Sequence, residues 1–114
     1  MLQTTILDFL EIKEVTLGDV IIQQGQKGDA VFIVNKGNYE VRIGKTDEEI
    51  SKAEGTVVHQ YRGDFDLYQS FGELAVMEDE DKRIRKASVV CTSNEGEVWI
   101  IPGELYSLLA DQEK

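Results

Sequence analysis

Short apolar runs alternate with turn-forming residues over most of the chain. Tyr39, Val41 and Ile43 alternate with polar residues, which is the pattern of a strand with one buried face. Further runs predict strands, the last two of which we expect to pair around the turn at 92–96: residues 57–61, 67–71, 87–91 and 97–101. Many short strands separated by turns are typical of an all-β sandwich or barrel.

Helical and loop patterns occupy the remaining segments. Residues 5–10 predict the end of a short helix, and Pro102 predicts the start of a second one with apolar Leu105, Leu108 and Leu109. The charged stretch 45–54 has no apolar period, so it predicts a solvated hairpin loop. Four glycines predict tight turns with positive φ, and we expect them to shape the fold rather than contact a ligand: Gly18, Gly25, Gly28 and Gly37.

Length and composition restrict the class of protein. A chain of 114 residues suits one domain, here 1–114, and a formal charge of −10 argues against a nucleic-acid surface. No apolar run approaches the roughly 20 residues that span a bilayer. The single cysteine, Cys91, excludes an intramolecular disulfide, which favours a reducing, cytoplasmic location. His59 and Cys91 are too few for a zinc site, no nucleophile–histidine arrangement is evident, and we expect neither a metal nor catalysis.

The most informative segment is Phe71-Gly72-Glu73-Leu74-Ala75, followed by Arg85. A glycine turn that opens a helix presents free backbone N–H groups and a partial positive charge, which together favour an anion. A nearby arginine can bind phosphate oxygens through two N–H groups. A glutamate in the same turn can accept hydrogen bonds from a sugar hydroxyl. Phosphate and sugar recognition in one short segment indicates a nucleotide.

This segment resembles the phosphate-binding cassette of the cyclic-nucleotide-binding domain, through Phe71 to Ala75 and then Arg85-Lys86-Ala87-Ser88-Val89. A second stretch, Gly18 to Gly25 and then Gly28 to Val34, resembles the glycine signature of the same family. The resemblance extends from about Val15 to Leu109. It implies an eight-stranded, jelly-roll-like double-stranded β-helix barrel with short flanking helices and a short helix in the cassette.

The resemblance also implies a role for each residue of the cassette. Gly72 and its neighbours Leu74 and Ala75 would donate backbone N–H groups to the cyclic phosphate of cAMP or cGMP. Glu73 would accept from the ribose 2′-hydroxyl, and Arg85 would pair with the phosphate. Lys86 and Ala87 would contribute an amide and shape near the base. The alternatives are that Glu73 is only a surface carboxylate at a helix start, and that Arg85 only forms an ion pair within the acidic run 78–81.

Three features depart from the family pattern. Seven residues separate Met77 from Arg85, more than is usual, and four of them are acidic. Lys86 replaces the alanine typical of cAMP sites and the threonine or serine typical of cGMP sites, which leaves the base preference open. The approach at 63–70 is longer than usual. Apart from these three departures, Tyr106 is the only aromatic residue of the C-terminal helix, where the family has a residue that caps the base.

By resemblance, the chain is expected to be a non-enzymatic sensor module of a larger regulatory protein. A cyclic-nucleotide-dependent protein kinase or its regulatory subunit is the first expectation, with a kinase catalytic domain or another effector domain as partner. The rival expectation is a degenerate copy that no longer binds nucleotide and serves in protein–protein contact.

Overall fold

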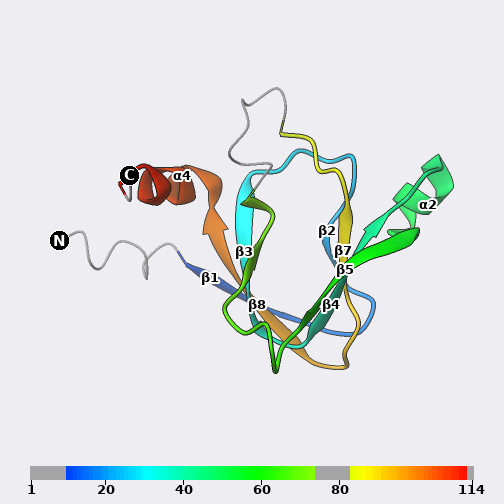
Figure 1. Cartoon of the computed structure of the whole chain (residues 1–114), viewed down its shortest axis with the longest axis horizontal. Helices are drawn as coiled ribbons and strands as arrows, with labels where there is room; N and C mark the ends of the chain where they lie inside the picture. The colour runs from blue at the N-terminus through cyan, green and yellow to red at the C-terminus, as the bar shows by residue number, and fades with distance from the viewer. Residues whose placement is uncertain (1–9, 74–82, 113–114) are drawn as a thin grey trace.

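The computed structural model describes residues 10–73 and 83–112. The described part is mostly β, with two α-helices (Figure 1). Its strands are β1 (Glu11–Val15), β2 (Val20–Ile22), β3 (Ala30–Lys36), β4 (Asn38–Ile43), β5 (Thr56–Arg62), β6 (Ser70–Phe71), β7 (Ser88–Cys91) and β8 (Gly96–Pro102). Its helices are α2 (Asp47–Ser51) and α4 (Gly103–Gln112).

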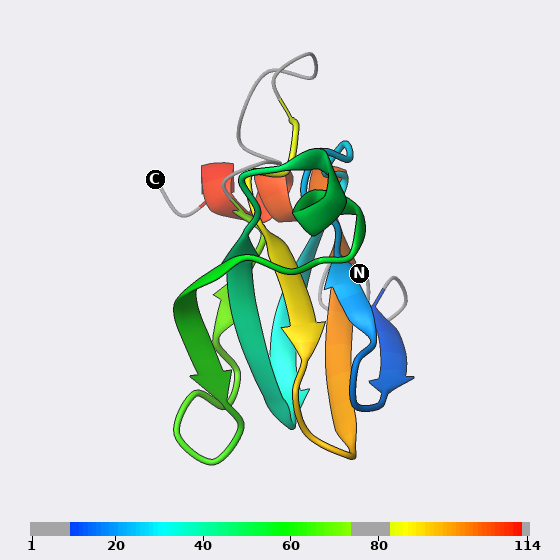
Figure 2. The same ribbon diagram turned by 90° about the vertical axis from the view of Figure 1, so that its right-hand side faces the viewer.

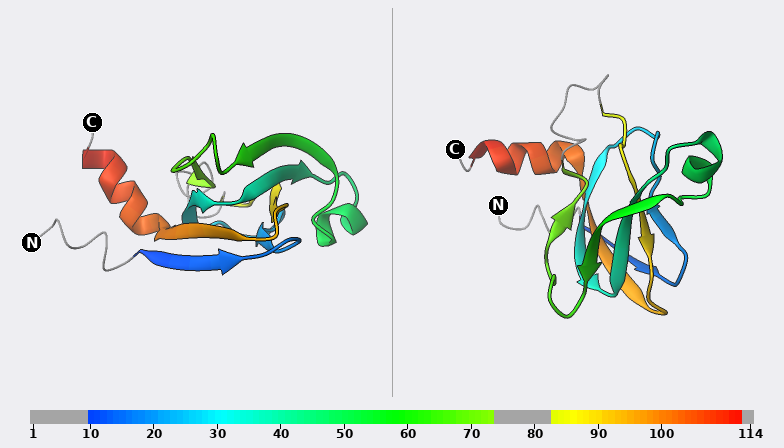
Figure 3. Two further views of the ribbon diagram at one scale, coloured as in Figure 1. Left: turned by 90° about the horizontal axis from the view of Figure 1, so that it is seen from below. Right: turned by 45° about the vertical axis from the view of Figure 1, so that its right-hand side comes forward.

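The strands form two four-stranded antiparallel sheets. One sheet has the order β1-β8-β3-β6 and the other the order β2-β7-β4-β5. The left view of Figure 3 shows the two layers from their edges, one above the other, and Figure 2 shows the strands of the second sheet side by side. This arrangement confirms the predicted jelly-roll-like barrel. The N-terminal helix expected at 5–10 falls outside the described residues except for Leu10, and the cassette helix expected after Glu73 lies outside them.

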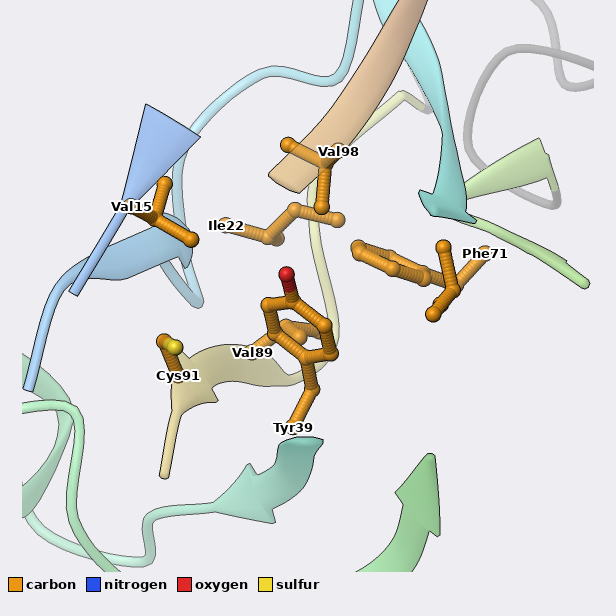
Figure 4. Close-up of a cluster of buried hydrophobic side chains, with 8 residues drawn as sticks. Val15, Ile22, Tyr39, Phe71, Val89, Cys91 and Val98 are labelled. Atoms are coloured by element: carbon orange, nitrogen blue, oxygen red, sulfur yellow. The ribbon is translucent and has the colours of Figure 1, made fainter. Parts of the chain in front are cut away.

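The core lies between the two sheets. Both sheets contribute to it, and Figure 4 shows Tyr39 of β4 facing Phe71 of β6. The cluster of buried side chains is Val15, Ile22, Val34, Tyr39, Phe71, Val89, Cys91 and Val98. The hydroxyl of the buried Tyr39 has a hydrogen-bond partner, because it donates to the Lys36 carbonyl at 2.7 Å. The alternation predicted for residues 38–43 is therefore confirmed at Tyr39 and Val41, which face the core.

The loop prediction for residues 45–54 is wrong in part, because α2 lies within it. Thr46 is the N-cap of this helix, and its hydroxyl accepts a hydrogen bond from the Glu49 N–H at 3.1 Å. The first turn contains Asp47, Glu48 and Glu49, whose negative charges interact favourably with the positive end of the helix dipole. The Thr46-x-x-Glu49 spacing was the available sequence signal. No residue of α2 is buried, so an apolar period could not reveal it.

The expected pairing of the last two strands is also wrong. Residues 88–91 form β7 and residues 96–102 form β8, but β7 pairs with β2 and β4, whereas β8 pairs with β1 and β3. The intervening turn crosses from one sheet to the other. The strand expected at 67–71 is confined to the two residues of β6.

Three of the four predicted turn glycines, Gly18, Gly25 and Gly37, have positive φ. The prediction is wrong for Gly28, whose φ is not positive. Pro102 ends β8 and α4 begins at the next residue, so the C-terminal helix starts where the sequence predicted. α4 packs against β3 and β8, and Figure 1 shows α2 on the opposite side of the barrel.

Candidate functional site

The segment that carries Arg85 is bound along the loop between β2 and β3. The Arg85 N–H donates to the Gln26 carbonyl at 2.7 Å, and the Arg85 carbonyl accepts from the Gly25 N–H at 2.8 Å. An isolated antiparallel bridge joins Lys27 and Ile84 next to these bonds. Backbone hydrogen bonds in both directions therefore fix the position of Arg85 before any ligand is present.

The Arg85 side chain points into the protein and is only 8% exposed. Its Nη1 donates to the Gly72 carbonyl and its Nη2 to the Ala30 carbonyl, each at 2.7 Å. The guanidinium also lies over the Phe32 ring, at 5.9 Å from the centroid. Burial lowers the pKa of Arg85, and the nearby Asp29 carboxylate opposes that shift. The group nevertheless stays charged at neutral pH, because an arginine pKa lies far above 7.

A guanidinium carries five N–H donors, and the two carbonyl bonds occupy two of them. The other three donors have no partner among residues 10–73 and 83–112, so they can serve a ligand. Carbonyl acceptors do not neutralise the positive charge as a carboxylate would. The arrangement is thus chemically suited to an anion such as phosphate.

Gly72 and Glu73 continue directly from β6. Gly72 has φ +90°, which turns the backbone at the end of the strand. The Glu73 carboxylate is half-buried and accepts a hydrogen bond from the Ser70 hydroxyl. A carboxylate has two oxygens with several acceptor sites, so this bond leaves capacity for a sugar hydroxyl. The charge of Glu73 adds to burial in raising the pKa of Tyr61.

The remaining predicted residues differ in their surroundings. Lys86 is exposed and Ala87 is half-buried. The following residue, Ser88, is 1% exposed, and its hydroxyl accepts from the Gln24 N–H at 2.9 Å. Leu74 and Ala75 lie outside the described residues, as does the acidic run 78–81. The structure therefore brings Gly72 and Arg85 into direct contact, with Glu73 next in the chain.

Sequence reasoning missed the partners of the arginine. Ala30, which accepts from Arg85 Nη2, lies 55 residues away in the chain, and its contribution is a backbone carbonyl. The side-chain type at position 30 therefore carries no signal for this role. Phe32, whose ring lies under the guanidinium, was visible only as part of an apolar run.

A polar hollow of about 210 Å³ lies at the other end of β4 and β5. None of the predicted ligand residues lines it. Its lining residues are Asn38, Tyr39, Glu40, Gln60, Tyr61, Arg62 and Thr92. Within the two described ranges, no group of three or more His, Cys, Asp or Glu side chains could hold a metal ion. Nor is any helix in those ranges long and apolar enough to cross a membrane.

The described residues form a two-sheet β-barrel with a buried arginine held at one corner by two backbone carbonyls. The sequence model of the cyclic nucleotide-binding domain matches residues 12–112. The chain belongs to this family, as its glycine and cassette motifs predicted.

Similar proteins include kinases and a kinase regulatory subunit. The chain is 35% identical over 91 residues to the cGMP-dependent protein kinase, isozyme 2 forms cD5/T2, of Drosophila melanogaster, covering 80% of this chain and 9% of the kinase. It is 33% identical over 89 residues to the cAMP-dependent protein kinase regulatory subunit of Mycosarcoma maydis, covering 78% of this chain and 15% of the subunit. The chain thus spans only a small part of the length of either relative.

A solved structure shows the same fold. The regulatory domain of Toxoplasma gondii PKA with cAMP superimposes with a TM-score of 0.71 at 20% identity, covering 92% of this chain and 35% of that chain.

Proposed function

We propose that this domain binds a 3′,5′-cyclic nucleotide, cAMP or cGMP, and acts as a ligand-sensing regulatory module. In this proposal Arg85 pairs with the cyclic phosphate, and the backbone N–H groups of Gly72, Leu74 and Ala75 bind its oxygens. Glu73 accepts from the ribose 2′-hydroxyl. Lys86 and Ala87 lie near the base.

The observation that carries the proposal is the state of Arg85. Its guanidinium is buried and charged, and two carbonyls hold it while its other three N–H donors have no partner in the described part of the chain. Burying a charge is costly unless the site gains from it. A phosphodiester bound there adds its negative charge to that of the nearby Asp29 and needs little rearrangement of the arginine.

The proposed output is the control of a protein kinase. The relatives support a kinase catalytic domain, in the same or another chain, as the effector partner. A ligand shifts such a switch only by its difference in affinity for two arrangements of the module. The domain itself supplies no catalysis in this proposal, and it acts in the cytoplasm as a single module of a larger regulatory protein.

Isothermal titration with cAMP and with cGMP tests the proposal directly. We expect saturable binding of at least one nucleotide and a matching rise in melting temperature, because a ligand specific for the folded state stabilises it. Arg85→Ala and Glu73→Ala should each abolish or strongly weaken the binding. Absence of heat and of a thermal shift at saturating concentrations of both nucleotides would contradict the proposal.

One observation favours a second candidate, a nucleotide-free domain that serves in protein contact. Both charged side chains of the proposed site already have partners within the protein, Arg85 through Gly72 and Ala30 and Glu73 through Ser70. In this candidate these internal hydrogen bonds occupy the groups that a nucleotide would need, so no nucleotide binds. The same titration separates the two candidates. The second predicts that neither wild type nor Arg85→Ala binds nucleotide, and that Arg85→Ala changes only the stability of the domain.

A further inference from the structure

A row of apolar side chains crosses the outer face of the sheet β1-β8-β3-β6. Val98 of β8 belongs to the core, so the next residue, Trp99, points outward. Trp99 is paired with Ile12 of β1 on one side and with Ile33 of β3 on the other. In the left view of Figure 3, β1 and β8 lie at the lower side of the barrel. Ile12 is 59% exposed, and the other two side chains of the row are half-buried.

Tyr68, in the loop between β5 and β6, extends this row. Its N–H donates to the Val34 carbonyl at 2.7 Å, and its ring centroid lies 5.7 Å from that of Trp99. Its φ is +70°, which is unfavourable for a bulky side chain, and yet the residue is 62% exposed. The backbone is thus strained where it places an aromatic ring on the surface beside a second one. Such rings are typical of protein contact surfaces. We name these four residues the outer row: Ile12, Trp99, Ile33 and Tyr68.

A helix already lies next to another part of this outer face. Val31 of β3 and Ile101 of β8 also point outward, where they are paired with each other. Both are buried, and α4, which begins two residues after Ile101, packs on β3 and β8. Helices that cover one face of a sheet are a common layer arrangement. The outer row has no comparable cover among the described residues, because Ile12 and Tyr68 stay exposed.

The Glu97 carboxylate is fixed beside the outer row. Glu97 and Trp99 are two positions apart on β8, so they share the outward face. The carboxylate accepts hydrogen bonds from Trp99 Nε1 at 3.2 Å and from the Asn35 side-chain amide. Both donors are neutral, so they orient the carboxylate and leave its negative charge in place.

No basic side chain balances this charge in the described part of the chain. Glu14 of β1 is directly opposite Glu97, and like charges at opposed positions of an antiparallel pair repel each other. Lys36 is opposite Glu97 on the other side, but its Nζ lies 3.8 Å from Glu95. Neither Glu14 nor Glu97 forms an ion pair with a lysine or arginine of the described residues. A positive charge brought by a partner would relieve the repulsion.

We propose that the outer row docks an amphipathic helix of a partner protein. Its apolar side chains pack on the outer row, and its arginine or lysine pairs with Glu97 and Glu14. A second copy of this chain does not fit, because it would bring acidic rows together in a protein whose formal charge is −10. A basic helix is instead complementary in charge to this face. The inference adds an interaction surface and does not depend on nucleotide binding.

Trp99 is the only tryptophan of the chain, so its fluorescence reports on this surface. The probes are three synthetic helices of about 18 residues without tryptophan, composed of leucine and arginine, of leucine and glutamate, or of serine and arginine. We expect the leucine–arginine helix to shift the Trp99 emission saturably to shorter wavelength, because the indole loses contact with water. The other two helices should bind at least about tenfold more weakly, since each lacks either the charge or the apolar side chains.

Two pairs of variants separate this surface from the total charge and from exposed apolar residues elsewhere. Ile12→Ser and Glu97→Gln should each weaken binding of the leucine–arginine helix about fivefold or more. Val58→Ser and Glu54→Gln are the matched controls, because both residues are exposed and lie on β5 and after α2. These two variants should bind the helix as wild type does.

Three outcomes would overturn the proposal. The first is no saturable change in Trp99 emission with the leucine–arginine helix. The second is equal affinity for the leucine–arginine and serine–arginine helices, and the third is an equal loss in Glu97→Gln and Glu54→Gln. The second and third outcomes would assign the binding to total charge. None of them bears on the proposed function, which the nucleotide titration tests separately.

Discussion

A β-carbon added to Gly72 would lie 2.8 Å from Arg85 Nη1, which is closer than such contacts occur in real proteins. It would also lie 3.2 Å from Ile22 Cδ1. The arginine cannot easily withdraw, because its guanidinium is held by the Gly72 and Ala30 carbonyls. Glycine at position 72 therefore serves both the turn, with φ +90°, and the close approach of the arginine.

Gly72→Ala should weaken cyclic nucleotide binding by about tenfold or more, the equivalent of losing one charge-assisted hydrogen bond, because Arg85 must move. It should also lower the free energy of unfolding by about 1–2 kcal/mol through the positive φ alone. Titration calorimetry and urea unfolding measure the two effects separately.

Gly18→Ala is the control for the backbone term. Gly18 has φ +89°, and an added β-carbon there would meet no atom within 4 Å. This variant should lose similar stability and keep wild-type affinity. If both variants bind nucleotide equally well, the contact between Gly72 and Arg85 does not matter for the site.

Arg85→Ala should destabilise the ligand-free domain as well as remove binding. The substitution takes the donors away from the Ala30 and Gly72 carbonyls, which costs about 1–3 kcal/mol if these groups stay buried. Arg85→Lys keeps a positive charge and loses the planar fork, so it should bind nucleotide weakly and recover only part of the stability. Urea unfolding without ligand checks the first effect, and calorimetry checks the second.

Arg42→Ala provides the comparison for a half-buried arginine elsewhere. Arg42 donates to the Ala53 carbonyl at 3.2 Å and forms an ion pair with Glu40 at 2.8 Å. We expect this variant to lose stability and to retain affinity. Loss of binding in Arg42→Ala would show that affinity follows stability rather than the Arg85 contacts.

The sequence predicted a part of the fold correctly where its residue pattern is typical of only one kind of structure. Alternation around Tyr39 and Val41 correctly predicted a strand with an inward face. The helix α2 was missed because its stabilising features are a cap and charges rather than an apolar period. The pairing of β7 with β8 was wrong because neighbours in sequence are not neighbours in a barrel whose chain crosses between sheets.

For the proposed site, the sequence singled out Gly72 and Arg85 but did not predict the groups that hold the arginine. Gly72 and Arg85 came from motif and chemistry, and the structure places them in contact. The acceptor at Ala30 is a main-chain oxygen, so no side-chain pattern could reveal it.

Buried tyrosines should make the domain sensitive to alkaline pH. Burial, and next the neighbouring Cys91, raise the pKa of Tyr39 well above its usual range, and burial followed by Glu73 and Asp66 raises that of Tyr61. A raised pKa in the folded state contributes stability that is complete below the ordinary tyrosine pKa of about 10 and is lost as the pH rises above it. Urea unfolding between about pH 8 and about pH 11 should therefore show a steep fall.

Tyr39→Phe isolates one of these two groups. It removes the hydroxyl that donates to Lys36, so it should cost about 1 kcal/mol at neutral pH. Above about pH 10, however, the free energy of unfolding of this variant should fall less steeply than that of wild type, because the variant lacks one buried phenol with a raised pKa. A slope identical to that of wild type would mean that Tyr39 ionises with equal ease in the folded and unfolded chain.

The acidic run 78–81 precedes Arg85 by a few residues and should oppose an anionic ligand. Two unit charges about 6 Å apart interact by about 3 kcal/mol at an effective dielectric of 20, and salt screens exposed charges. Replacing Glu78, Asp79, Glu80 and Asp81 by their amides should therefore tighten cyclic nucleotide binding at low salt, with a smaller gain at about 1 M salt. The control replaces four exposed acidic residues elsewhere by their amides, which changes the net charge equally: Glu11, Glu14, Glu54 and Asp64. A gain confined to the first variant locates the repulsion in the 78–81 run, whereas equal gains in both would assign it to the total charge of −10.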